Sequence, residues 1–140
     1  SGQKAAKPIS TLGKVAVGLL AMQLSFVYSH HAYESGSIFE DAICHGVYIE
    51  VGDAATITWF QKQGLQGNGY TVLALIDALC RTELTDDREK YAMEAEADNA
   101  WVYGRDPAAI ERLVHRFKAN TATIAGVEKL IKAANAEFLE

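Results

Sequence analysis

The sequence predicts an all-α fold, in which residues 1–140 form one compact domain of six or seven helices. Apolar residues recur at helical spacing in several segments, which is the pattern of helices that pack on a core. Capping residues stand before most of these segments. Hydrophobic residues make up 49% of the chain and there are only 2 prolines, which excludes a disordered or fibrous chain.

The N-terminal part predicts a central helix over residues 15–34, with residues 1–12 as a flexible arm before it. Residues 15–29 are apolar on all sides, as in a helix that others surround. This run follows three lysines and superficially resembles a signal peptide, but no small-residue cleavage site comes after it. It is also shorter than the roughly 20 residues that cross a bilayer, so we expect no membrane span.

The segment 37–40 (SIFE) has the S-x-x-E pattern of a capping box and predicts a helix over residues 38–51. The end of this helix is ambiguous, because residues 46–51 alternate and include β-branched side chains. A β-hairpin over residues 46–60, and hence an α+β fold, is the alternative. We favour the helix because a lone strand pair is marginally stable and no third strand stands out.

The rest of the chain predicts helices that begin and end at local signals. Asp53 caps a short helix, and a glycine-rich connection follows it. Gly104 ends a later helix, and Asp106 with Pro107 begins the next. The predicted helices are 54–63, 70–81, 86–103, 107–120 and 124–138.

The charge of the chain excludes one class of function, and its two cysteines leave two alternatives open. The net charge of -5 excludes a generic nucleic-acid binder, which neutralises phosphates with Lys and Arg. Residues 1–80 hold 4 basic and 6 acidic residues, whereas residues 81–140 hold 9 and 12. The first half therefore hides much of its surface, either in the core of the domain or against a partner, which includes a second copy of the chain. Cys44 and Cys80 fit one disulfide or two buried thiols.

One group of possible metal ligands lies between residues 30 and 50. His30 and Glu34 form an i, i+4 pair on one predicted helix, and Asp41 and His45 form another on the next. Two imidazoles and two carboxylates suit a divalent transition metal, so a metal-binding helical enzyme or carrier is the alternative function. The pairs lack the signature of di-iron bundles, and no other catalytic pattern stands out. The sequence therefore favours a binding protein without a cofactor over an enzyme.

The stretch 83–98 is locally acidic, with seven acidic residues against Arg88 and Lys90. Such a face favours a basic partner protein, and two aromatic residues that follow are typical interface anchors. We therefore predict a small helical interaction module or inhibitor, with a homodimer as a further option. The candidate partner-binding residues are Asp86, Asp87, Glu94, Trp101 and Tyr103.

Residues 41–52 (DAICHGVYIEVG) contain the pattern D-A…G-x-Y-[LI]-E-x-G. This stretch resembles the bacterial immunity proteins that neutralise type VI secreted cell-wall amidases. Residues 75–80 resemble, more weakly, a cysteine-containing helix of that family. The resemblance implies an all-helical, largely dimeric inhibitor located in the periplasm. It covers these two segments only, and residues 86–140 have no counterpart in it.

Overall fold

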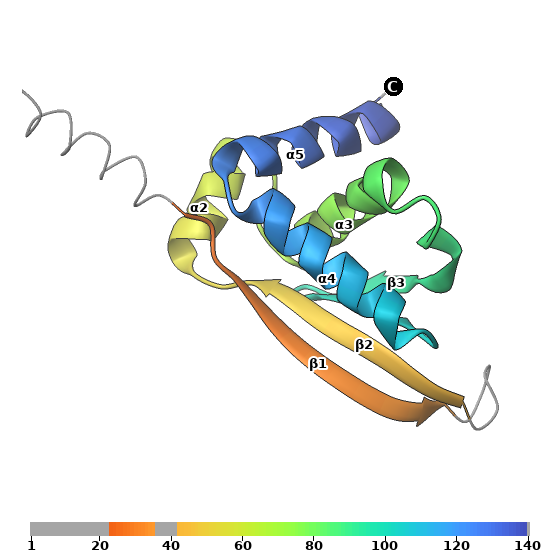
Figure 1. Ribbon diagram of the computed structural model, residues 1–140. Helices are drawn as coiled ribbons and strands as arrows, with labels where there is room; N and C mark the ends of the chain where they lie inside the picture. The colour runs from red at the N-terminus through yellow and green to blue at the C-terminus, as the bar shows by residue number, and fades with distance from the viewer. Residues whose placement is uncertain (1–22, 36–41, 140) are drawn as a thin grey trace, which may run out of the picture.

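The computed structural model describes residues 23–35 and 42–139, which form an antiparallel sheet with helices packed on it (Figure 1). The protein is therefore α+β, and the prediction of an all-α bundle is wrong. In chain order the described elements are β1 (Phe26–Ser35), β2 (Ala42–Val51), α2 (Ala54–Lys62), α3 (Gly69–Glu83), the 3-10 turn η1 (Arg88–Lys90), β3 (Ala92–Ala95), β4 (Ala100–Gly104), α4 (Pro107–Thr121) and α5 (Ile124–Leu139).

The four strands lie in the order β1-β2-β4-β3, and every neighbouring pair is antiparallel. β1 and β2 pair along their whole length, from Phe26 opposite Val51 to Ser35 opposite Ala42. β4 then adds to the other side of β2, although about 50 residues separate the two strands along the chain. The sheet is thus two hairpins joined at β2 and β4, with β1 and β3 at its edges.

Helices α3, α4 and α5 lie together on one side of the sheet, and α2 lies at the end where β2 finishes (Figure 1). Alternate residues of the central strands point into this layer, among them Val47, Ile49 and Val102, which have no exposed surface. Phe117 of α4 meets them and also receives the ring edge of Phe26 at 5.3 Å between centroids. The core therefore lies between one face of the sheet and helices α3 and α4, and α5 packs on these two helices from the side away from the sheet.

Helices α2 and α4 begin where capping residues predicted them. The Asp53 carboxylate accepts a hydrogen bond from the Thr56 amide at 2.8 Å, at the start of α2. Asp106 accepts from the amides of Ala108 and Ala109, and Pro107 occupies the first turn of α4. These contacts satisfy amide groups that have no partner inside the helix, so the predictions for α2 to α5 agree with the structure within a few residues.

The predicted N-terminal helices are strands where the structure describes them. The described end of the predicted helix 15–34 belongs to β1, and the predicted helix 38–51 is β2. Residues 1–12 and the capping box at 37–40 lie outside the described residues. The hairpin alternative is right about a strand at 46–51, but residues 56–60 belong to α2. The argument against strands failed because the further strands come from segments that had been assigned to helices.

The predicted helix 86–103 is also wrong. This segment forms η1, β3 and β4, with a turn in which the Glu96 amide donates to the Asn99 carbonyl at 2.9 Å. Asp98 and Asn99 supply the turn, and both residue types favour turns over helix interiors. Of the two alternatives for the cysteines, the structure shows two buried thiols, because Cys44 and Cys80 are free and fully buried. In the part of the chain that the structure describes, no helix is long and apolar enough to cross a membrane.

A candidate protein-binding face on the sheet

The side of the sheet away from the helices carries a row of aromatic side chains. Successive residues of a strand point to opposite faces, so the residues that alternate with the buried Val47, Ile49 and Val102 point away from the core. We call the resulting group the aromatic face. Its members are His31 of β1, Tyr48 of β2, and Trp101 and Tyr103 of β4.

Each of these side chains contacts the next one along the row, which crosses three strands. The Tyr48 ring stacks on the Trp101 indole at 4.1 Å between centroids, and Trp101 stacks on Tyr103 at 5.4 Å. His31 meets Tyr48 edge-on at 5.3 Å. Aromatic pairs at such distances attract each other beyond the effect of the area that they bury. His31 is exposed and the other three rings are partly exposed, so the face presents an ordered apolar surface to solvent.

Gly46 allows the indole of Trp101 to lie against the backbone of β2. A Cβ atom at Gly46 would come within 2.7 Å of Cζ3 and 2.8 Å of Cζ2 of that ring. Any other residue would therefore displace the indole. A glycine inside a strand often marks such a close approach, and here the missing side chain sets the position of the central ring.

The charged side chains that the strand register places beside the aromatic face are acidic. Glu94 lies directly opposite Trp101, and its Oε2 accepts a hydrogen bond from the Tyr103 hydroxyl at 2.9 Å. Glu50 follows Tyr48 on the same side of β2. Among the described strand positions on this face there is no lysine or arginine. The strand residues beside the rings are therefore acidic, while Arg105, directly after β4, lines a pocket together with Tyr103.

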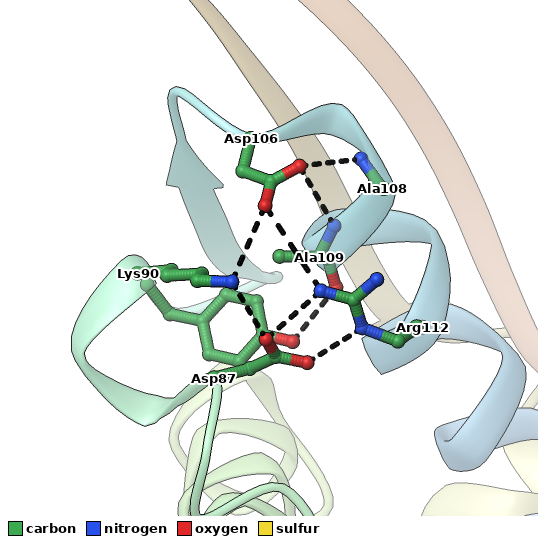
Figure 2. Close-up of polar contacts among 7 residues, drawn as sticks. Asp87, Lys90, Asp106, Ala108, Ala109 and Arg112 are labelled. Carbon is green, nitrogen blue, oxygen red and sulfur yellow. Dashed lines mark hydrogen bonds and ion pairs between the residues drawn. The ribbon is translucent and has the colours of Figure 1, made fainter.

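A polar network around the buried Asp87 holds the hairpin of β3 and β4 against the helix layer (Figure 2). The guanidinium of Arg112 on α4 binds both carboxylate oxygens of Asp87, at 2.7 and 2.9 Å. The Lys90 ammonium lies 3.1 Å from Asp87 and 3.4 Å from Asp106. Arg112 therefore keeps the pKa of Asp87 low, at about 2, despite the opposing effect of desolvation. Both ends of the hairpin are tied to the start of α4, because Lys90 precedes β3 and Asp106 follows β4.

The structure places the five predicted partner-binding residues at three different sites. Glu94, Trp101 and Tyr103 come together on the aromatic face. Asp87 is 7% exposed and belongs to the polar network. Asp86 is exposed and lines an open polar groove of about 780 Å³ between the end of α3 and α4. The acidic stretch 83–98 is thus not one continuous surface, because it turns from a helix end into a strand.

The metal-site prediction needed each pair of ligands to lie one turn apart on a helix, but the described ligand positions lie in strands β1 and β2. In a strand, residues four apart share a face but lie about 13 Å from each other, which is the spacing of His30 and Glu34 in β1. Asp41 lies outside the described residues. The Nε2 atom of His30 instead lies 3.6 Å from Oε1 of Glu111 on α4. His30 and His45 also line a pocket of about 330 Å³. No group of three or more potential ligands with metal geometry occurs among the described side chains.

Sequence reasoning missed His31 and Tyr48 as members of the aromatic face, and Gly46 as the position against which the Trp101 ring lies. The signal was the alternation of residues 46–51, which predicts that positions 46, 48 and 50 share a face if the segment is a strand. Only the pairing of β2 with β4 brings Tyr48 beside Trp101. A comparison of this chain with protein-family models, with curated proteins and with solved structures found no match.

Proposed function

We propose that this protein is a binding module that recognises a cationic segment of another protein through the aromatic face. The observation that carries the proposal is the stacked row of Tyr48, Trp101 and Tyr103 on the side of the sheet opposite α3, α4 and α5, which none of the described helices covers. Rigid aromatic rings supply contact area at a small cost in side-chain entropy. Tyrosine and tryptophan also dominate the energy of many protein interfaces.

The chemistry of the face favours arginine or lysine in the partner. A guanidinium or ammonium group is attracted to the face of a tryptophan or tyrosine ring, and Glu50 and Glu94 lie within the same surface. The chain as a whole carries a net charge of -5, which speeds encounters with a basic partner. The same charges disfavour single-stranded nucleic acid, although aromatic rings on a sheet can stack on bases.

An inhibitor of the immunity type is one form of this proposal. The resemblance to amidase-immunity proteins rests partly on Gly46, Tyr48 and Glu50, and strand alternation places these three positions on the side of the sheet that carries the aromatic face. The all-helical fold that the resemblance implied is not the fold of this chain. Direct binding therefore tests this form best, with a secreted cell-wall amidase as the candidate partner.

The test is a selection of displayed random peptides on the immobilised protein, with the Trp101→Ala variant as the counter-selection target. We expect the enriched peptides to contain arginine or lysine beside apolar residues. Their binding, measured by fluorescence anisotropy, weakens at least tenfold in Trp101→Ala. It also weakens as salt rises, because exposed charges are screened.

Tyr70→Ala is the matched control, since Tyr70 is 58% exposed on α3 and lies outside the aromatic face. This variant should bind the selected peptides as the unmodified protein does. Equal losses in Trp101→Ala and Tyr70→Ala would overturn the proposal. Enrichment of acidic peptides would overturn the cationic preference. Tight binding of an oligothymidine or oligouridine probe, with no peptide enriched, would assign the face to nucleic acid instead.

A further inference from the structure

β1 forms one edge of the sheet along its full ten residues. The strand at the other edge, β3, has four residues. Within the described residues no strand pairs with the outer side of β1. A long edge strand presents a row of amide and carbonyl groups that can extend the sheet by pairing with another strand.

The direction of these backbone groups follows from one hydrogen bond at the start of β1. The Gly52 amide donates to the Ser25 carbonyl at 2.7 Å, so residue 25 directs its backbone groups toward β2. In an antiparallel pair these directions alternate along the strand. The backbone groups of residues 26, 28, 30, 32 and 34 therefore point to the outer side. Five residues in regular succession are available for pairing.

The outer edge lacks the features by which sheets usually block such pairing. Natural edge strands carry lysine, proline or bulges, or they are very short. Residues 26–32 (FVYSHHA) contain no lysine, arginine, acidic residue or proline. β1 pairs with β2 residue by residue without an interruption, so it contains no bulge. Val27 is also 44% exposed, so it adds apolar surface to this edge strand.

We propose that the outer edge of β1 pairs with β1 of a second copy, so that two sheets join into one of eight strands. The edge suits a second copy, because residues 26–32 carry no formal charge at neutral pH and an antiparallel pairing centred on residue 30 or 31 places Glu34 opposite an uncharged residue. A charged partner strand would find no counterion along these residues. A two-fold axis normal to the sheet also keeps both helix layers on one side, so the two aromatic faces would lie on the other. The proposal does not depend on what the aromatic face binds.

Two registers give the longest overlap of the ten-residue strand while pairing outward-pointing residues with each other. One is centred on His30, so that Phe26 lies opposite residue 34 of the second copy. The other is centred on His31. In either register the central residue faces its own copy across the axis, at a Cα separation of about 4.5–5.5 Å. This distance suits a disulfide, so one cysteine at the correct position would link the two copies.

The first experiment is sedimentation equilibrium of the full chain from about 1 to 100 µM, because small interfaces commonly dissociate in the micromolar range. We expect a monomer–dimer equilibrium. Ala32→Pro removes an outward-pointing amide without removing a bond to β2, and Ser29→Lys adds a charge at the edge. Each should weaken the dimer at least tenfold. Thr58→Lys, at an exposed site on α2, adds the same charge away from the edge and should leave the equilibrium unchanged.

The second experiment is mild oxidation of His30→Cys and His31→Cys, with Thr58→Cys as the control. A disulfide-linked dimer should form in one of the first two variants and not in the control. The native thiols give little background, since both are buried and burial raises the pKa of Cys80 to about 12. Circular dichroism of each variant establishes that it is folded.

Two results would overturn the proposal. One is a monomer throughout the concentration range. The other is a dimer that survives Ala32→Pro and Ser29→Lys and gives no cross-link at residues 30 and 31. Trp101→Ala separates this proposal from the proposed function, because it should abolish peptide binding and leave the dimer intact.

Discussion

The two faces of the sheet are built by the same strands but from different side chains. Toward the helices, Ile49 and Val102 have no exposed surface and fill a packed core. Toward solvent, Tyr48 and Trp101 stack on each other and stay partly exposed. Neighbouring residues of one strand point to opposite faces, so a side chain that stabilises the fold stands next to one that is available for recognition. Substitutions at neighbouring positions should therefore change different properties.

The largest expected effect comes from Ile49→Ala, compared with Tyr48→Ala beside it. Ile49→Ala leaves a cavity in the core and should lower the free energy of unfolding by about 2–5 kcal/mol. Tyr48→Ala loses mainly ring stacking, about 0.5–1.5 kcal/mol, but should abolish peptide binding. Urea denaturation followed by circular dichroism measures both values. Equal losses of stability would show that the aromatic face is a second core.

The next effect tests whether the missing side chain at Gly46 sets the position of the Trp101 ring on the aromatic face. Gly46→Ala places a methyl group against the indole of Trp101, and such overpacking should cost about 1–3 kcal/mol. The fluorescence of Trp101, recorded in a Trp59→Phe background, should shift as the ring moves. In a Trp101→Ala background the same Gly46→Ala change should be nearly neutral. A cost that persists without the indole would place the cause in the backbone of β2.

The polar network gives a smaller effect with a defined pH dependence. The Arg112 contact lowers the pKa of Asp87 in the folded protein to about 2, below the value of about 3.9 in an unfolded chain. The ionised Asp87 therefore stabilises the folded protein fully above the pKa of the unfolded chain, and this contribution is lost as the pH falls toward 2. Asp87→Asn should lower the melting temperature at pH 7 by roughly 5 °C and flatten the dependence below pH 4. Asp86→Asn, at the exposed neighbour, should do neither; equal effects would contradict a specific role of the network.

The sequence predicted elements whose signals are local. Asp53 and Asp106 accept hydrogen bonds from the next turn of α2 and α4, so the type and start of these helices follow from a few adjacent residues. The glycine-rich connection before α3 was also predicted, and Gly64 and Gly67 adopt positive φ there. Helices of this kind satisfy their backbone groups within the segment itself.

The strands escaped prediction because their partners lie elsewhere in the chain. β2 lacks local start and stop signals, and its stability depends on β1 and on β4, about 50 residues later. Without that pairing, the short apolar run at 46–51 fits a helix or a strand. Trp101, Tyr103 and Glu94 were identified by residue type and belong together in the structure. Asp86 and Asp87 were grouped with them only because they are near in sequence.

The smallest expected effect distinguishes charge from hydrogen bonding at the edge of the aromatic face. Tyr103→Phe removes the hydroxyl that donates to Glu94 but keeps the stacked ring, so stability should change by less than about 0.5 kcal/mol. Glu94→Gln keeps a carbonyl acceptor for that hydroxyl and removes the charge. If Glu94 pairs with the partner's cation, Glu94→Gln weakens binding of the selected peptides severalfold and reduces its salt dependence, whereas Tyr103→Phe does not. Equal effects of both variants would assign recognition to the Tyr103–Glu94 hydrogen bond rather than to the charge.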